Sequence, residues 1–566
     1  MELQGQQKQN YLKGAAVLAA ATIFVKLVGA VYKIPIFNIL GNAGVGAFQT
    51  TYDIYALIMT IAIAGVPVAL SRMVSAASAK GDSGLVKRYF SVALPAFILI
   101  GLTAMSLMFF FADSLAGLMN NSLAAPGIRV LAPAVFFVCI IAVYRGYTQG
   151  FQNMIPTAMS QVVEVISKMA FGLIVALWLA RREYGTDIVS AGAIMGVTIG
   201  LGLCIPLLIW YKQRLDRRLG VQPPPSADGT PFVREGGLQP SQDGDLDEVP
   251  QEKLPGRWQV FASLMKVSIP IALGAAFMHI MVVIDSSVVR GRLQSALGLT
   301  EYEASSQFGI YTLGMSIFNL PSALVIPIAI SIIPAISSAI ARSRGDEANS
   351  IMQSSVKLVN LLALPAAAGL MVLASPIMFS LYNDTAQVTS TVLTILGSAS
   401  FFVCFQLIST AILQANGFER LAMLSFLAGG VLRIVVNYFL VAIPQVGIIG
   451  QAIGTFLCFL VISIMNITFI IVKVKDRPNF RAVFAKPLLC AALMAVAVYG
   501  SYTLISFIGS GFIGTGRTAV TLYLALSIFF SALVYIVLII VTRTVTREDL
   551  KLVPKGEKLA KLLKIK

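Results

Sequence analysis

Ionisable residues inside apolar runs are the first candidates for chemistry in this sequence. Lys26 and Lys33 lie seven residues apart in one such run, which places both side chains on one face of a helix. Gly29 on the same face leaves room for a group to approach. Two ammonium groups lining a cavity would suit a diphosphate or another polyanion. In the alternative interpretation, Lys33 reaches the polar boundary of the run beside Pro35, and only Lys26 lies deep.

Acidic residues occur in similar surroundings. Asp53 could neutralise one of the lysines as a structural counter-ion, or it could contact a substrate. Glu164 and Lys168 are four residues apart in the favourable order, so the spacing predicts an internal ion pair that is structural or serves coupling. Arg433 lies in a comparable run without an acid four residues before it, which leaves its charge freer for substrate.

His279 and Asp285 lie in a later run but are six residues apart, so they do not share a helix face well. His279 is the single histidine, and its two interpretations are a hydrogen-bonded packing residue and a proton relay. Asp285, near the end of its run, could serve Arg290 or Arg292.

The sequence contains no pattern for a metal, a cofactor or a hydrolytic site. All five cysteines fall inside apolar runs without ligand spacing. A nucleophile elbow and a P-loop are both absent from the sequence. We therefore predict neither a metal nor a cofactor, and no enzymatic activity.

The composition then decides what kind of elements carry these residues. Of 566 residues, 57% are hydrophobic and 12% are charged, whereas soluble domains have about a quarter charged residues. Such a chain cannot cover a water-facing surface, but it can face lipid. The composition predicts a polytopic membrane protein, and its polar N-terminus without a cleavage site predicts that the first span is retained.

Fourteen apolar runs are long enough to be spans. They fall at about 14–39, 47–78, 89–112, 128–150, 157–180, 188–211, 260–289, 306–341, 352–374, 388–415, 418–441, 446–472, 486–508 and 518–542. If alternate connections are cytoplasmic, beginning with the N-terminus, 31 Lys and Arg residues lie inside and 6 lie outside. This bias predicts that both termini are cytoplasmic. The net charge of +16 therefore reflects topology, and we expect no nucleic-acid partner.

The spans divide the chain into five segments. We predict an N-lobe at 1–212, a disordered cytoplasmic linker at 213–258, a C-lobe at 259–474, spans 13 and 14 at 475–545, and a basic cytoplasmic tail at 546–566. The tail could form an amphipathic helix on anionic lipid or a frayed end that serves only topology.

The two lobes are related by an internal repeat. FFVC occurs at 136–139 and again at 401–404, and the same offset of 265 carries Gln149 onto Gln414 and Lys168 onto Arg433. Six spans in each half preserve sidedness, so the repeat is parallel. The predicted fold is an all-α polytopic membrane protein with two six-helix lobes and two C-terminal helices, and transporters of this kind bind substrate between the lobes.

The opening stretches of the chain have a specific resemblance. KGAAVLAAATIFVKLVGAVYKIPIFNILG followed by GAFQTTYDIYALIMTIAIAGVPVALSRMVSAASAKGD resembles the stage V sporulation protein B and YtgP branch of polysaccharide-biosynthesis transporters. This branch belongs to the multidrug/oligosaccharidyl-lipid/polysaccharide (MOP) exporter superfamily and is related to the MurJ lipid II flippases. The resemblance implies two lobes around a central cavity, two extra helices with a groove for a lipid tail, and undecaprenyl-diphosphate-linked sugars as substrates.

The resemblance maps the family's first-span cations onto Lys26 and Lys33. The chain departs from the better-known flippases elsewhere, with Met59 or Thr60 and Ser316 in place of further arginines. Near the start of the second span, Gly46 stands where an acid is expected, and Asp53 follows seven residues later.

The function implied is a flippase that turns a lipid-linked oligosaccharide, such as the peptidoglycan precursor lipid II, from the inner to the outer leaflet of a bacterial cell membrane. A flippase for another envelope polysaccharide, a cation-coupled multidrug antiporter of the MATE type and a membrane enzyme are the alternatives. The expected partners are this substrate, membrane lipid and a coupling ion, for which proton and sodium both stay open.

Overall fold

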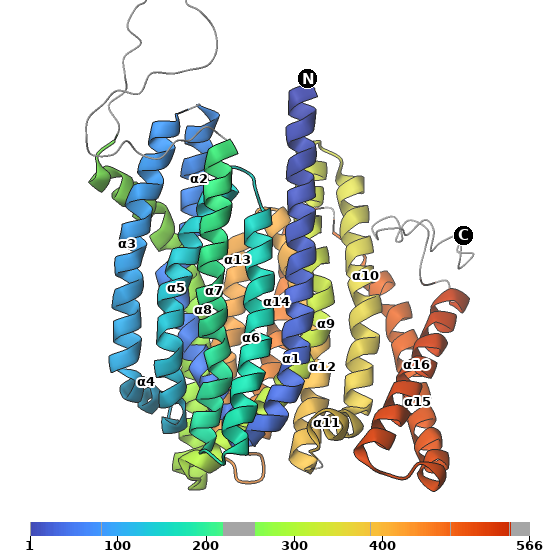
Figure 1. The fold of residues 1–566 in the computed structure, drawn as a ribbon. Helices are drawn as coiled ribbons and strands as arrows, with labels where there is room; N and C mark the ends of the chain where they lie inside the picture. The colour runs from blue at the N-terminus through green and yellow to red at the C-terminus, as the bar shows by residue number, and fades with distance from the viewer. Residues whose placement is uncertain are drawn as a thin grey trace, which may run out of the picture.

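The computed structural model describes residues 2–80, 82–218, 255–384, 386–475, 477–542 and 544. Within these ranges the regular structure is helical (Figure 1). Most of the predicted linker and all of the predicted basic tail lie outside the described residues.

The helices follow the predicted apolar runs closely. In the first half they are α1 (Glu2–Ile63), α2 (Val66–Ala79), α3 (Ser83–Phe110), α4 (Ala112–Leu118), a 3₁₀ turn η1 (Ser122–Ala124), α5 (Ala125–Gly150), α6 (Ile155–Arg181) and α7 (Thr186–Arg218). In the second half they are α8 (Arg257–Leu297), α9 (Glu301–Ala341), α10 (Gly345–Val372), α11 (Ala374–Tyr382), α12 (Gln387–Ala415), α13 (Glu419–Leu440) and α14 (Ile449–Lys473). Two further helices follow, α15 (Phe480–Phe512) and α16 (Arg517–Val541).

Among the described residues, 13 helical segments are long and apolar enough to cross a membrane, whereas the sequence predicts fourteen spans. The difference lies in the first segment, 20–79, which covers both of the first two predicted spans. Gly41 interrupts its helix with a φ of 64°, a conformation that glycine adopts readily. The N-terminus and α2 both lie at the upper end of the molecule in Figure 1, so the chain turns back between them.

Helices of the same half pack mainly on one another. In the first half α7 packs on α5 and α6, and in the second half α12 packs on α9, α10 and α14. The halves meet chiefly where α1 contacts α8 and α9, and α8 also contacts α2 and α3. We call the end at which α7 stops and α8 begins the linker end, and the opposite end, which carries α4 and α11, the clasp end (Figure 1).

The sequence repeat has a structural counterpart in a bent helix. The α3–α4 bend at Phe111 has φ −98° and ψ 19°, and the α10–α11 bend at Leu373 has φ −98° and ψ 18°. Each short helix is followed by a left-handed asparagine, Asn120 with φ 51° and Asn383 with φ 55°. The two halves therefore share an irregular detail that hydrophobic periodicity did not predict.

Both short helices end against a neighbour from outside their own half. Three successive carbonyls at the end of α4 accept hydrogen bonds from α8: Ser287 Oγ to Leu118 O at 2.7 Å, Arg290 Nε to Met119 O at 2.8 Å and Gln294 Nε2 to Asn120 O at 2.7 Å. These carbonyls have no partner within their own helix, so the second half completes the first. We call this set of bonds the α4 clasp.

The α11 end is held in a related way. Asn38 Nδ2 from α1 and Arg517 Nη2 from α16 each donate to Leu381 O at 2.7 Å. Arg517 Nε also donates to Ser380 O at 2.9 Å, and its Nη2 donates to Asn38 Oδ1 at 3.3 Å. Cationic groups at a helix C-terminus also offset the negative end of its dipole.

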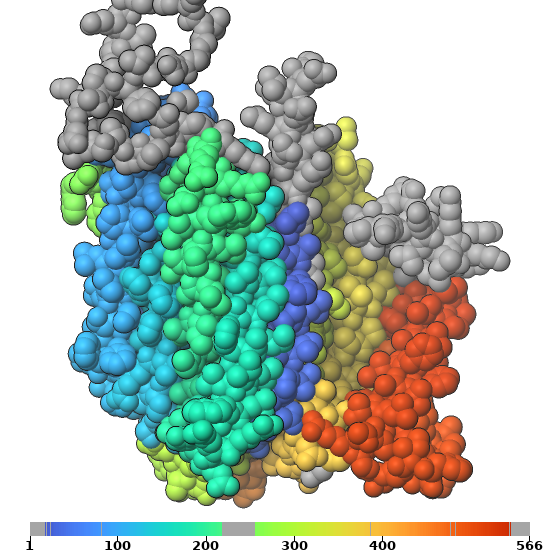
Figure 2. All heavy atoms as spheres, viewed as in Figure 1, coloured from blue at the N-terminus to red at the C-terminus, as the bar shows by residue number. Residues whose placement is uncertain are grey.

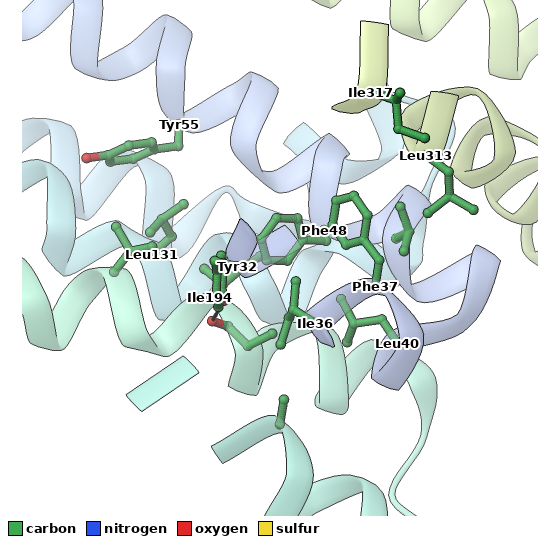
Figure 3. Packing of buried hydrophobic residues seen from close by; sticks show 14 of the residues in the cluster. Tyr32, Ile36, Phe37, Leu40, Phe48, Tyr55, Leu131, Ile194, Leu313 and Ile317 are labelled. Carbon is green, nitrogen blue, oxygen red and sulfur yellow. Dashed lines mark hydrogen bonds between the residues drawn. The ribbon is translucent and has the colours of Figure 1, made fainter. Parts of the chain in front are cut away.

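An apolar core lies behind these polar contacts and includes residues of both halves. Figure 3 shows Ile36, Phe37 and Leu40 beside Phe48, with Leu313 of α9 close by. Phe37 and Phe48 meet edge to face, with ring centroids 5.8 Å apart. Burying these side chains fixes the turn of α1 against α9.

The α15–α16 pair forms a projection at one side of the molecule (Figure 2). It packs on α10 and α11, and Asn360 Nδ2 of α10 donates to Val483 O at 3.1 Å. Many of its outward side chains are apolar, such as Val496, Phe507 and Phe512 at 73%, 81% and 86% exposure, as expected for a surface that faces lipid.

Close backbone contact at the clasp end leads to a stability prediction. A Cβ atom at Gly309 would lie 1.8 Å from Asn42 O, so Gly309→Ala forces α1 and α9 apart and should cost about 1–3 kcal/mol. Differential scanning fluorimetry in detergent should show a melting temperature several degrees lower. Gly274→Ala in α8 is the matched control, because nothing lies within 4 Å of its Cβ position. Equal melting temperatures for the two variants would contradict the tight contact.

Candidate functional site between the halves

The sequence-predicted Asp53 lies where α1 and α8 meet. It is 8% exposed, and its Oδ2 accepts from Ser286 Oγ at 3.1 Å while its Oδ1 accepts from Gln49 Nε2 at 2.8 Å. No ion pair within 4.0 Å joins Asp53 to a lysine among the described residues. Its carboxylate therefore connects the two halves through polar neighbours, although it still acts electrostatically on Lys33.

Lys33 and Lys168 approach the same region from α1 and α6. Lys168 Nζ lies 4.6 Å from the ring centroid of Tyr52 and 5.6 Å from that of Tyr32, and Lys33 Nζ lies 5.9 Å from the Phe37 ring. The two lysines are half-buried and interact electrostatically with each other. Aromatic faces hold a cation without neutralising it, so both charges are left for an anion.

Glu164 and Lys168 make no ion pair within 4.0 Å among the described residues, although Glu164 still acts electrostatically on Lys168. Glu164 Oε2 instead pairs with Arg145 Nη2 of α5 at 3.2 Å, and Arg145 Nε donates to Ser160 Oγ at 2.9 Å. The spacing along α6 allowed the pair, but Lys168 turns to the tyrosine rings while α5 presents a guanidinium to Glu164. This change leaves the ammonium of Lys168 at the interface.

Lys26 lies about two helical turns from Lys33, before Gly41 on α1, and its side chain is exposed. No hydrogen bond or ion pair joins it to another described residue. Of the two predicted first-span cations, Lys33 is thus the one that the structure places among other charges, and a substrate contact by Lys26 stays a prediction.

The second half holds a compact charged group around Asp285. Arg433 Nη2 lies 2.7 Å from Asp285 Oδ2, and Asn437 Nδ2 donates to Asp285 Oδ1 at 2.5 Å. Arg433 Nη2 also donates to Tyr311 OH at 3.1 Å, and this hydroxyl lies 2.9 Å from Thr455 Oγ1. Arg433 and Asn437 are one turn apart on α13, which packs on α8, so both reach the same carboxylate.

This geometry corrects one expectation. Arg433 was expected to carry a freer charge because no acid precedes it by four residues, yet its counter-ion comes from another helix. Asp285, for which Arg290 and Arg292 were the expected partners, forms its ion pair with Arg433 and also interacts electrostatically with Arg290. Arg292 instead donates to Tyr438 O at 3.2 Å.

Arg290 is the residue whose role sequence reasoning missed. It was considered only as a partner of Asp285 and placed beyond the span expected to end at 289, but α8 continues to Leu297 and Arg290 is 0% exposed. Its guanidinium lies 4.2 Å from the Phe308 ring centroid and interacts electrostatically with Asp53 and Asp285. The sequence offered no signal for it, because Ser286, one turn earlier on the same face of α8, is identified as an interface residue only by the structure.

His279 gains no polar role in this arrangement. It is partly exposed on α8, and no hydrogen bond or ion pair joins it to another residue in the part of the chain described. Grouped His, Cys, Asp and Glu side chains that could hold a metal ion are also absent from the described residues. A relay by His279 stays a prediction.

The charged residues at the meeting of the halves form what we call the interface cluster. It consists of four cations and two acids, namely Lys33, Lys168, Arg290, Arg433, Asp53 and Asp285. Both halves contribute cations, and the cations exceed the acids by two. An interior with excess positive charge favours an anionic ligand over a cationic one.

Comparison with known sequences places the chain among membrane transporters. The profile of a family described as "Polysaccharide biosynthesis protein" matches residues 11–340, and that of a family described as "MatE" matches residues 270–439. Stage V sporulation protein B of Bacillus subtilis (strain 168) is 25% identical over 559 residues, which cover 97% of this chain and 98% of that protein. Lipid II flippase MurJ of the same organism is 24% identical over 502 residues, 86% of each chain.

Solved structures share the fold. A structure described as "Lipid II flippase MurJ, inward closed conformation" aligns with a TM-score of 0.64 at 15% identity, covering 92% of this chain and 98% of that one. An inward-facing multidrug resistance MATE family transporter of the MOP superfamily aligns with a TM-score of 0.55 at 16% identity, covering 85% of this chain and 98% of its own. The polytopic helical architecture is therefore confirmed at the level of the fold.

The Asp285–Arg433 pair leads to a second stability prediction. Arg433→Met leaves the buried Asp285 carboxylate without its cation and should destabilise the protein by about 3–5 kcal/mol, measured as a fall in melting temperature. The double variant Asp285→Leu/Arg433→Met removes both charges and should recover much of that loss.

The exposed pair of Arg129 and Asp113 supplies the control. Arg129→Met should cost about 1 kcal/mol or less, because water solvates both partners. If Arg433→Met and Arg129→Met were equally mild, the buried ion pair would not contribute as described.

Proposed function

Because the chain belongs to the polysaccharide biosynthesis protein family, we propose that it moves undecaprenyl-diphosphate-linked sugars from the inner to the outer leaflet of a bacterial cell membrane. The substrate we favour is the peptidoglycan precursor lipid II, since a relative covering 86% of the chain is named a lipid II flippase. Both termini then lie in the cytoplasm, and the linker end faces inward.

The observation that carries this proposal is the excess of cations in the interface cluster. A diphosphate presents several anionic oxygens close together, and it suits cations that converge from two sides. Lys33 and Lys168 approach from the first half without an ion pair within 4.0 Å among the described residues, and Arg290 and Arg433 approach from the second. The diphosphate would contact cations of both halves at once. Its affinity would therefore depend on the relative orientation of the two halves.

The proposed mechanism is alternating access. The hydrogen bonds between the halves gather at the clasp end, where Ser286, Arg290 and Ser305 of the second half contact the first. A substrate would then enter from the linker end, bind the lysines, and leave after the clasp end opens. Sugar and diphosphate would cross inside the protein while the prenyl chain stays in lipid.

Binding measurements test the cationic site. Lys33→Ala and Lys168→Ala should each weaken binding of an undecaprenyl-diphosphate-linked sugar roughly tenfold or more, because each removes a charge-assisted contact. Microscale thermophoresis on protein in nanodiscs gives the affinities. Arg181→Ala is the matched control, since Arg181 lies exposed at the end of α6 away from the cluster. Unchanged affinity in both lysine variants would contradict the site, and Lys26→Ala tests the third predicted cation in the same way.

The α15–α16 pair is proposed to supply an apolar surface for the prenyl chain. Its lipid-facing side chains and its seat on α10 and α11 support this role. A chain that ends at about residue 485 should lose transport in proteoliposomes while the lobes stay monodisperse in gel filtration. Full transport by such a truncated, folded chain would contradict the proposal.

A cation-coupled drug antiporter is the second candidate, because the MatE profile matches 270–439 and a MATE transporter shares the fold. Such a pocket needs an acid that is available to a cation. Asp285 is already paired with Arg433, and Asp53 accepts from Gln49 and Ser286. Efflux of cationic dyes that is unaffected by Lys33→Ala and lost in Asp53→Asn would favour this candidate over the flippase.

A further inference from the structure

Arg290 is buried in a way that leaves its charge incompletely satisfied. Its Nε donates to Met119 O at 2.8 Å, but its Nη1 and Nη2 are buried and have no hydrogen-bond partner. Arg290 also makes no ion pair within 4.0 Å among the described residues. The four N–H groups on Nη1 and Nη2 therefore keep hydrogen-bonding capacity that an anion could meet if it reached them.

The neighbouring carboxylates make no hydrogen bond to the Nη1 and Nη2 groups of Arg290. Asp285 is neutralised by Arg433, and Asp53 accepts from Gln49 and Ser286. A further polar atom nearby is also unsatisfied, since Asn121 Oδ1 has no partner although Asn121 Nδ2 donates to Thr50 Oγ1 and to Ser305 Oγ. The α4 clasp therefore joins the halves through bonds that leave several buried groups unpaired.

Arg290 takes part both in the α4 clasp and in the interface cluster. Through Nε it donates to the carbonyl of Met119 at the end of α4, and through its charge it belongs to the interface cluster. Separation of the halves at the clasp end would break the bond to Met119 and expose five N–H groups of a guanidinium. These groups have the fork geometry that binds phosphate oxygens in two places at once.

We propose that Arg290 is the outer anion-binding residue of the transport path. It closes the clasp end while it is bound to Met119, and it binds the diphosphate of the passing substrate once that end opens. This proposal rests on the proposed function for the identity of the substrate, but the anion site and its link to opening can be tested without transport.

The first experiment measures opening by labelling a cysteine. Thr50→Cys places a thiol at a position that is 0% exposed beside the α4 clasp, in protein whose five native cysteines are replaced by serine. Reaction with a water-soluble maleimide in nanodiscs then reports how often the clasp end opens. Arg290→Gln should accelerate labelling about tenfold, because a charge-assisted bond to Met119 is lost.

Arg292→Gln is the control for opening. It removes a guanidinium two residues away that bonds Tyr438 of its own half, so its labelling rate should match that of the parent. An unchanged rate in Arg290→Gln, or no labelling in any variant, would overturn the proposal that Arg290 closes an end that opens.

The second experiment tests the anion site with inorganic diphosphate. The Lys33→Ala/Lys168→Ala background removes the two lysines proposed to bind the substrate first. In this background, diphosphate should raise the labelling rate at position 50 because it binds the open state. The rise should persist in Arg290→Lys, which keeps the charge, and should vanish in Arg290→Gln. An equal rise in Arg290→Gln, or none with Arg290 present, would overturn the anion site.

The two proposals can fail separately. If diphosphate acts through Arg290 but no prenyl-diphosphate sugar is transported, the anion site stands and the proposed substrate is wrong. If transport is observed while diphosphate has no effect that depends on Arg290, the proposed function stands and Arg290 has only a structural role. Melting temperatures of the Arg290 variants show whether each is folded.

Discussion

Moving a charged side chain out of water costs several kcal/mol, and the arrangement of the two halves follows from how that cost is met. Asp285 and Arg433 neutralise each other inside the second half. Ser286, the next residue on α8, contacts Asp53 in the first half. Two adjacent residues of α8 therefore have partners in different halves: Asp285 pairs with Arg433 of the second half, and Ser286 bonds Asp53 of the first half. Helix α8 thus packs within its own half and also forms part of the interface.

The same helix explains why polar and apolar contacts have separate roles. The apolar core that includes residues of α1 and α9 holds the turn at Gly41 in place. The polar contacts of α8 lie beside this core and act over short distances. Hydrogen bonds of this kind can be exchanged for other partners at small net cost, whereas packed apolar surface cannot. A transporter that changes shape needs both kinds of contact.

The sequence predicted the spans well because lipid solvation imposes a long apolar run on each of them. The repeat was also visible, and the bends at Phe111 and Leu373 match it. The short helices α4 and α11 were not predicted, since 7 and 9 residues in a connection carry little periodic signal. At the site, Lys33 and Asp53 were singled out because they are ionisable residues within apolar runs, and the structure places both near the meeting of the halves. The partners of Glu164 and Arg433 depend on which helices pack together, and sequence spacing within one helix cannot supply that information.

The end of α11 differs from that of α4 in which part of the chain supplies the arginine. At α4 the arginine comes from α8, which is part of a half, but at α11 it comes from α16, and Asn38 of the first half shares the same carbonyl. Arg517 also bonds Asn38 directly. The helix pair outside the repeat is therefore bonded to both halves at one of the two bends. The repeat gives each half a similar bend, but the bend beside α11 is held by three separate parts of the chain, so the two bends are not equivalent in the way that they are held.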